Sequence, residues 1–330
     1  MTILKKCGAI LLLLAMLTAV FGCALQEEST PTTEATPETT TISETEGETA
    51  VETTVEIATT PETTPETTAE ETAAATTEAP KSEPVVIKIV SMNTQNSGYD
   101  QSGEPTIETK YQKLANAISE KQPDLVLLQE VNTKAALEAI LARMENASNY
   151  GFVYEAATTT MVIYNKDVFA LLDQGKELIG EADDADGSAY ERYLVWAKLR
   201  HKASSMPLIV VPVHVDYVKN ACKAQINRIV DYLKTNFPSA PYILGGDFNC
   251  EISVVSATSL TLEGYKNART VAKEKVNGDE KTFPKNDVII DYVWYKSGTV
   301  ITATAKKYEV LMQTLPTDHR PIYVEIELTK

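Results

Sequence analysis

The chain has 330 residues, with 46 acidic and 30 basic side chains and a formal net charge of −16. Of the acidic residues, 15 lie within 24–84, so that 31 acidic and 27 basic residues remain from residue 85 onward. That near balance argues against a strongly basic domain of the kind that binds nucleic acid nonspecifically. The four cysteines are too few for a disulfide framework.

Residues 1–23 are typical of an export signal. Two lysines precede an apolar stretch over 10–20, which is too short to span a bilayer. The stretch ends in Gly22-Cys23 before polar sequence, and this resembles the lipobox of bacterial lipoproteins, whose Cys is lipidated. Phe21 is bulkier than that motif usually accepts, which leaves open ordinary signal cleavage, giving a secreted protein, or an uncleaved anchor. We expect an extracytoplasmic protein held on the cell membrane by a lipid on Cys23.

Residues 24–84 consist mainly of Thr, Glu, Pro and Ala, with near-repeats of Pro-Glu-Thr-Thr. This segment has no apolar periodicity and its like charges repel, so we expect a disordered tether. A glycosylated stalk or wall spacer is the alternative to a plain linker, which we favour. Residues 85–330 are long enough for one large domain. Within it, Cys222 and Cys250 could pair, although two free thiols are the favoured state.

The domain alternates segments typical of strands and of helices. Runs rich in Val, Ile and Tyr predict strands over 85–91, 124–129, 151–156, 161–165, 169–172, 193–199, 208–214, 242–246, 288–295, 301–310 and 322–328. Apolar residues at three- and four-residue spacing predict helices over 108–121, 133–146 and 218–237. Many strands with interspersed helices indicate two packed sheets flanked by helices.

Polar side chains occupy the ends of several of these strands. In chain order, they are Asn93, Glu130, His214, Asp247 with Asn249, Asp291, and Asp318 with His319. Taken alone, a string such as Gly-Asp-Phe-Asn could be an ordinary turn. Together, carboxylates, amides and imidazoles at strand ends are what a hard cation and a phosphate ester require.

The order and spacing of these residues resemble the endonuclease/exonuclease/phosphatase superfamily, which includes nucleases, sphingomyelinases and inositol-phosphate phosphatases. The resemblance covers 85–330, and its motifs are specific only as a set. It implies a four-layer α/β/β/α sandwich of two mainly antiparallel sheets flanked by helices.

The resemblance also implies a role for each strand-end residue. Asn93, Glu130 and Asp318 would bind the metal, although Glu130 could instead be a salt-bridged surface residue and Asn93 a capping amide. Asp247 would align and deprotonate the attacking water, and Asn249 would steady the phosphate. His319 would bind the scissile phosphate, with Asp291 fixing its tautomer. His214, for which a core histidine is the alternative, would bind phosphate or transfer a proton.

Two further positions carry weaker inferences. Arg192 lies where many members of the superfamily place an Arg just before a strand, and it could reach phosphate or be a surface residue. Pancreatic-type deoxyribonucleases support the equivalent of His214 with a Glu, but this chain has a Thr-rich run near Thr158, so His214 needs another partner. His201 lies in a charged run and is expected on the surface.

These expectations combine into a metal-dependent hydrolase of phosphate esters, most simply a phosphodiesterase or nuclease. Mg²⁺ is the expected cofactor, with Mn²⁺ or Ca²⁺ possible alternatives. The substrate classes are nucleic acid, phospholipid and small phosphorylated metabolites, and a phosphomonoesterase or phospholipid phosphodiesterase would use the same fold. We expect a monomer. A tethered binding module on an inactive fold is disfavoured, because no position of the set is replaced.

Overall fold

The computed structural model of the protein describes residues 83–96 and 106–330. The predicted signal over 1–23, with its lipidation site Cys23, lies outside the described residues, as does the tether up to residue 82. In the described part of the chain, no helix combines the length and the apolar character needed to cross a membrane.

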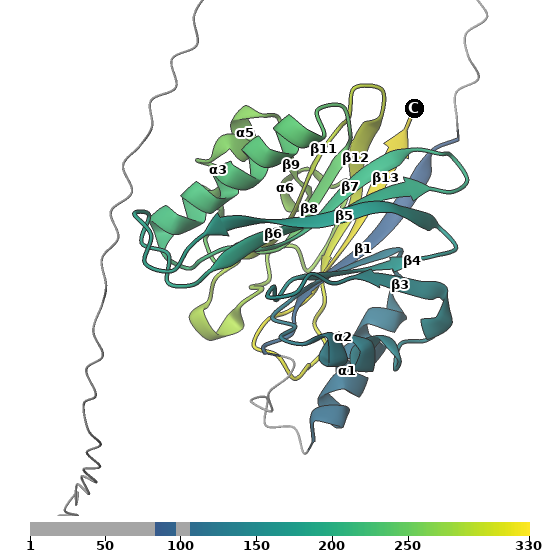
Figure 1. The fold of residues 1–330 in the computed structure, drawn as a ribbon. Coiled ribbons are helices and arrows are strands. Elements are labelled where there is room, and N and C mark those ends of the chain that lie inside the picture. Colours follow the sequence, from purple (N-terminus) through teal and green to yellow (C-terminus); the bar gives the residue numbers. More distant parts are fainter. Residues whose placement is uncertain (1–82, 97–105) are drawn as a thin grey trace, which may run out of the picture. The chain divides into compact units, whose positions relative to one another are not determined.

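Two mixed sheets form the centre of the domain (Figure 1). The first contains, in spatial order, β10 (Glu274–Val276), β12 (Thr302–Val310), β13 (Ile322–Thr329), β1 (Val85–Asn93), β2 (Leu125–Gln129), β4 (Met161–Asn165) and β3 (Tyr150–Val153). The second contains β5 (Phe169–Gly180), β6 (Arg192–His201), β7 (Pro207–His214), β8 (Tyr242–Asp247), β11 (Asp291–Lys296) and β9 (Lys266–Asn267). Neighbours are antiparallel except for the pairs β1–β2, β7–β8 and β10–β12.

Helices connect two of the parallel pairs and cover the outer faces of the sheets (Figure 1). The helices are α1 (Ile107–Glu120), α2 (Lys134–Leu141), α3 (Lys219–Asn236), α4 (Ile252–Val255), α5 (Ser259–Leu262) and α6 (Ala268–Val271), with 3-10 turns η1 (Ala147–Asn149) and η2 (Pro284–Asn286). The Thr106 hydroxyl caps α1 by accepting the backbone N–H of Thr109. In α3, Cys222, Ile226 and Leu233 form part of one buried face.

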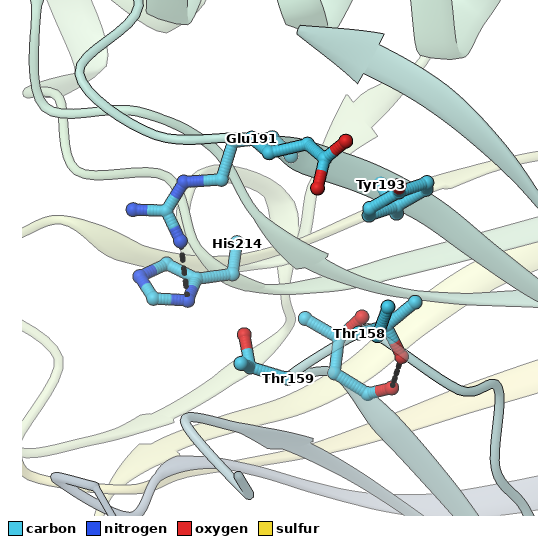
Figure 2. Close-up of a pocket in the computed structure, with 8 residues that line it drawn as sticks. Thr158, Thr159, Glu191, Tyr193 and His214 are labelled. Atoms are coloured by element: carbon cyan, nitrogen blue, oxygen red, sulfur yellow. Dashed lines mark hydrogen bonds between the residues drawn. The ribbon is translucent and has the colours of Figure 1, made fainter. Parts of the chain in front are cut away.

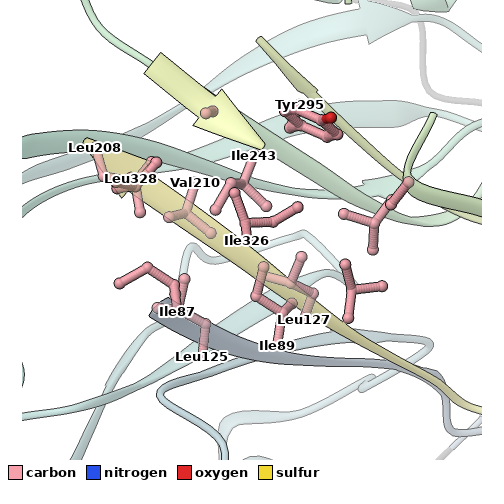
Figure 3. Close-up of a cluster of buried hydrophobic side chains, with 14 of the residues drawn as sticks. Ile87, Ile89, Leu125, Leu127, Leu208, Val210, Ile243, Tyr295, Ile326 and Leu328 are labelled. Carbon is pink, nitrogen blue, oxygen red and sulfur yellow. The ribbon is translucent and has the colours of Figure 1, made fainter. Parts of the chain in front are cut away.

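Three apolar layers hold these elements together. Between the sheets, side chains of β1, β2 and β13 meet those of β7, β8 and β11, with Leu127, Val210 and Ile243 among them (Figure 3). A second layer joins the six-stranded sheet to α3, and a third joins the seven-stranded sheet to α1 and α2. The predicted four-layer α/β/β/α sandwich is therefore confirmed.

The largest boundary error of the sequence analysis concerns β5. The predicted strand over 169–172 extends to Gly180, through polar residues that the apolar pattern does not mark as a strand. The reason is position, because β5 is the edge strand of its sheet, has bulges in its pairing with β6, and exposes much of its outer surface. Conversely, α2 ends at Leu141 rather than at 146, and the chain turns there through Asn146 at a positive φ of 56°.

Two further expectations concern single side chains. Cys222 and Cys250 are free and buried, in agreement with the favoured reading. His201 is not a surface residue. It is buried, its ring packs edge-on against Phe169, and its Nδ1 is hydrogen bonded to the Ser204 hydroxyl. The charged neighbours of His201 concealed this, because alternate residues of a strand face opposite sides of the sheet.

A pair of glycines lets the carboxyl end of β8 lie close to its neighbours. A Cβ on Gly245 would lie 2.6 Å from the Leu127 side chain of the opposite sheet. A Cβ on Gly246 would lie 2.0 Å from the backbone oxygen of Val213 on β7. Gly246 directly precedes Asp247, so this close backbone approach fixes where that carboxylate lies.

Replacing Gly246 with Ala should therefore destabilise the domain. The clash involves backbone rather than a flexible side chain, so we expect a loss in the free energy of unfolding of at least about 1–3 kcal/mol. Gly278→Ala is the matched control, since its Cβ would meet only the Lys275 side chain, at 3.3 Å. Urea unfolding of both variants measures the difference, and equal stabilities would contradict the steric argument.

Candidate functional site

The strand-end residues come together at one end of the two sheets. The strands β1 and β2 run parallel and finish side by side at Asn93 and before Glu130, while β7 and β8 bring His214 opposite Asp247. Because β11 is antiparallel to β8, its first residue, Asp291, also lies opposite Asp247. The loop before β13 reaches the same end, because β13 is antiparallel to β1. Topology alone thus concentrates these polar groups.

Asn93 joins two carboxylates that lie on different sheets. Its amide nitrogen donates to Glu130 Oε1 and to Asp247 Oδ2, both at 3.0 Å. Its amide oxygen accepts the backbone N–H of Gln95 at 2.9 Å. The second oxygen of Glu130 accepts the backbone N–H of Asn96 at 2.9 Å. Glu130 has a φ of 59°, a left-handed conformation that is uncommon for a non-glycine residue and that is found at functional sites.

Asp247 is the central carboxylate of the site. It is 1% exposed, and its Oδ1 accepts the backbone N–H of Asn249 at 2.8 Å. Burial and the neighbouring Asp291 raise the pKa of Asp247 to about 7, against the opposing effects of His319 and the hydrogen bonds from Asn249 and Asn93. A carboxylate with that pKa can both accept and release a proton near neutral pH.

His319 and Asp291 form a buried pair. Nδ1 of His319 lies 3.0 Å from Asp291 Oδ2, and its Nε2 lies 3.6 Å from Asp247 Oδ2. Burial lowers the pKa of His319, but Asp291, Asp247 and Asp318 together raise it further, to about 10. The imidazole is thus charged at neutral pH, with Nδ1–H donating to Asp291 and Nε2–H facing Asp247.

The local fold holds both members of this pair in place. The buried hydroxyl of Thr282 accepts the backbone N–H groups of Ile290 and Asp291. The Phe283 ring lies 4.7 Å from the His319 ring, centroid to centroid. The Thr317 hydroxyl donates to the Asn93 backbone oxygen, which ties the loop carrying His319 to the end of β1.

His214 has Arg192 as its partner, in place of a carboxylate. A guanidinium nitrogen of Arg192 lies 3.1 Å from Nδ1 of His214. This hydrogen bond is drawn as the dashed line beside His214 in Figure 2. Since a guanidinium only donates, Nδ1 must accept and the proton of the neutral ring must be on Nε2. That nitrogen faces Asp247 Oδ2 at 3.8 Å and Glu130 Oε1 at 4.0 Å. Burial, Arg192 and His319 hold the pKa of His214 well below its usual range.

The remaining predicted residues lie around this centre. The amide nitrogen of Asn249 donates to the Val215 backbone oxygen at 3.0 Å, and the residue borders the same cavity as Glu130 and His214. Arg192 also lines this cavity and a smaller one beside the Thr158–Thr159–Thr160 run, some of which Figure 2 labels. Asp318 is half-buried and lies near enough to His319 to raise its pKa.

Sequence reasoning missed several residues that border the site. A cavity of about 370 Å³ is lined by Glu130, Arg192, His214 and Asn249 together with Asn96, Asn132, Thr159, Tyr190 and Tyr217. The last five lie in loops, and only Thr159, in the Thr-rich run beside Thr158, belongs to a segment that the sequence marks out. For the two tyrosines, the closeness of Tyr190 to Arg192 and of Tyr217 to His214 along the chain is the one available signal.

The donor atoms present fit a hard divalent cation. Carboxylate oxygens dominate, and the Glu130 and Asp247 carboxylates are held together by one amide. A second possible group consists of Asp247, Asp291 and His319, whose candidate ligand atoms all lie within 4.8 Å of one another. For His319 to bind a cation in that group, its charged ring would first have to lose a proton, so Glu130 is the better first ligand.

Comparison with known proteins gives a family and a fold. Residues 91–319 match the Endonuclease/Exonuclease/phosphatase family. An endonuclease/exonuclease/phosphatase from Bacteroides vulgatus is 20% identical with a TM-score of 0.62, covering 74% of this chain and 99% of that one. No curated protein matches the chain.

Two other solved structures share the fold. A mannosyl-6-phosphatase of Bacteroides thetaiotaomicron is 17% identical, with a TM-score of 0.61, over 73% of this chain and 99% of that one. D. rerio TDP2, complexed with a single-strand DNA product, is 17% identical, with a TM-score of 0.56, over 73% of this chain and 98% of that one. At these identities the likeness concerns the fold.

Proposed function

The chain belongs to the endonuclease/exonuclease/phosphatase family, and from that membership we propose that its domain hydrolyses phosphate esters with the help of a divalent cation. The observation that carries the proposal is the joining of Glu130 and Asp247, from opposite sheets, by the Asn93 amide. Around them stand a charged imidazole, His319, and a neutral one, His214. A purely structural polar network would not need two histidines in opposite protonation states beside one carboxylate.

The residues divide the reaction between them. When bound, Mg²⁺ held by Glu130 and Asp318 would supply positive charge to the phosphoryl oxygens. The Asn93 amide orients the Glu130 carboxylate through its nitrogen, since its oxygen already accepts the Gln95 N–H. Asp247 takes the proton of the attacking water, for which its pKa of about 7 is suited. His319 donates from Nε2 to a phosphoryl oxygen, while Asp291 keeps the ring charged and oriented. His214 can donate a hydrogen bond from Nε2, and Asn249 steadies the phosphate beside it. As the water oxygen bonds to phosphorus, the P–O bond to the alcohol breaks and the departing oxygen takes a proton from solvent.

Two substrate classes are supported by different observations. TDP2, a structural neighbour, is complexed with single-strand DNA product, which favours phosphodiesters, the class that the sequence analysis placed first. Against a long nucleic acid, the site cavity has a volume of only about 370 Å³. Among the described residues that line it, Arg192 is the single cation. A mannosyl-6-phosphatase is also a neighbour, so a small phosphomonoester is the second candidate.

The test is hydrolysis by the purified protein of plasmid DNA, RNA, sphingomyelin, inositol phosphates and chromogenic mono- and diesters. We expect activity to disappear in EDTA and to return with Mg²⁺ or Mn²⁺. Glu130→Gln should lower turnover by about 10²-fold or more, because it removes one negative charge from the cation site. Glu177→Gln, an exposed carboxylate on β5, is the matched control. Full activity in chelator would refute the proposal, and a complete lack of hydrolysis would favour a binding module.

We also propose that the domain is displayed outside the cytoplasm through a lipid on Cys23. The support is the sequence pattern of positive residues, short apolar stretch and Gly22-Cys23. Cys23→Ser should release the protein from membranes or leave an unprocessed precursor. Mass spectrometry of the N-terminal peptide measures this, with Cys7→Ser as the control. A wild-type protein that is recovered secreted and without lipid would contradict the proposal.

A further inference from the structure

Two exposed tyrosines border the candidate active-site cavity. Tyr190 is 56% exposed and Tyr217 is 58% exposed, and both line the cavity that contains Glu130 and His214. Their ring centroids lie 6.2 Å apart with the planes at 64°, so they form an edge-to-face pair. They come from different segments of the chain, the one before β6 and the one before α3. Two exposed aromatic rings at the opening of a polar site are available to a ligand.

A single buried carboxylate holds the backbone at both tyrosines. Asp216 is fully buried and accepts the backbone N–H groups of Ala189, Tyr190 and Val218, at 2.9 to 3.2 Å. It thereby binds the backbone of Tyr190 itself and of the residue after Tyr217. Two more hydrogen bonds complete the network, from the Ser188 hydroxyl to Asp216 and from the buried Gln225 amide to Ser188.

This network is what distinguishes the two rings from ordinary surface tyrosines. Burying a carboxylate is costly unless its hydrogen bonds are satisfied, and here they are satisfied by the two segments that carry the rings. In addition, the Arg192 guanidinium, which is bonded to His214, lies 5.4 Å from the Tyr190 ring centroid. The backbone that carries both rings is therefore held in a defined position, and the Tyr190 ring also contacts the Arg192 guanidinium beside His214.

The chemistry of the cavity indicates what the rings bind. Apart from Glu130 and Arg192, its lining is neutral, with the Asn96 and Asn132 side chains hydrogen bonded to each other at 3.2 Å. Flat aromatic surfaces beside amide groups suit a ring that has polar substituents, such as a sugar or a nucleoside. An acyclic or long apolar group would leave either the amides or the ring faces without contacts.

We propose that the phosphate ester hydrolysed here carries a ring, a sugar or a nucleoside, that packs against Tyr217 and Tyr190. This inference rests on the proposed function for the position of the phosphate, at His214 and His319. The ring then lies on the outer side of the cavity, where the side-chain amides of Asn96 and Asn132 can bind its polar groups. Tyr217 is a specificity-determining residue in this arrangement.

The test compares phosphate esters that differ only in the alcohol, using the purified full chain with Mg²⁺. The panel is glycerol 3-phosphate, which is acyclic, with a hexose 6-phosphate and a nucleoside monophosphate, and the matching methyl diesters of each. We expect Tyr217→Ala to lower kcat/KM for the ring-bearing esters by about tenfold or more, and to change that for the glycerol ester less than twofold. Tyr217→Phe should retain most of the wild-type value. Leu262→Ala, 87% exposed on α5, is the surface control.

The outcomes separate this inference from the proposed function. Equal losses for acyclic and ring-bearing esters, or none, overturn the ring site while hydrolysis itself stands. The ring-bearing ester whose kcat/KM falls more in Tyr217→Ala shows whether the sugar or the nucleoside is the group recognised. If no ester is hydrolysed, calorimetry of the same esters decides: binding that weakens about tenfold in Tyr217→Ala supports the ring site, and its absence overturns it.

Discussion

Replacing Asp247 with Asn should lower turnover by about 10²–10⁴-fold and leave the fold intact. The change removes the group that accepts the proton of the attacking water, while its shape is kept. Asp247 is the carboxylate that Asn93, Asn249 and His319 all contact, which places it at the centre of the site. Loss of its burial cost should even offset part of the lost hydrogen bonds.

The measurement is turnover of the best substrate at saturating Mg²⁺, with circular dichroism and thermal unfolding to verify folding. Asp231→Asn, an exposed carboxylate on α3, is the matched control and should retain wild-type turnover. A loss confined to KM, with unchanged turnover, would show that Asp247 binds substrate without transferring a proton. The assignment of the general base would then have to move to another group.

The fold was predictable because its information is local. Strand composition, helical periodicity and the prolines and glycines between them placed most of the long elements within a few residues, with β5 and α2 as the exceptions. The register that brings Asp291 opposite Asp247 was not local, since it depends on pairing between β8 and β11 across 44 positions of the chain. Short elements such as β9, β10 and α4 to α6 have two to four residues each, too few to show a period.

The site residues also fall into those that the local sequence reveals and those that it does not. Polar residues at the ends of apolar strands stand out, because an unpaired carboxylate in such a place is costly. The residues that orient them do not stand out. Thr282 holds the backbone of Asp291 through its hydroxyl, and Arg192 sets the tautomer of His214 from another strand. Neither role can be read from the neighbours of these residues in the sequence, because each contact spans a loop or a strand pair.

His214 has an arginine as its partner, where a carboxylate partner would have had the opposite effect on the imidazole. A carboxylate partner would raise the basicity of the imidazole, whereas burial, the Arg192 cation and His319 favour the neutral ring and hold its pKa well below the usual range. His319, with Asp291, is charged instead. Two histidines beside one carboxylate thus supply a charged and a neutral donor, and a phosphate between them would meet N–H groups from both sides.

Asp291→Asn and His319→Ala should each lower turnover by about 10²–10⁴-fold, and the double variant should be little worse than either. The reason is that the two residues act as a unit. Without Asp291 the buried imidazole loses the partner that keeps it charged, and without His319 the buried carboxylate orients nothing. Turnover of the four proteins under one metal condition measures the coupling.

The free energy of unfolding of these variants tests the same pair independently. Both side chains are buried and joined at 3.0 Å, so His319→Ala leaves Asp291 as a buried charge without its partner. We expect that variant to lose about 3–5 kcal/mol in the free energy of unfolding. Adding Asp291→Asn to it should recover part of the loss, since the unpaired charge is then gone. If the double variant lost turnover multiplicatively and stability additively, Asp291 and His319 would act separately. The pairing would then explain neither the charge of His319 nor its position beside Asp247.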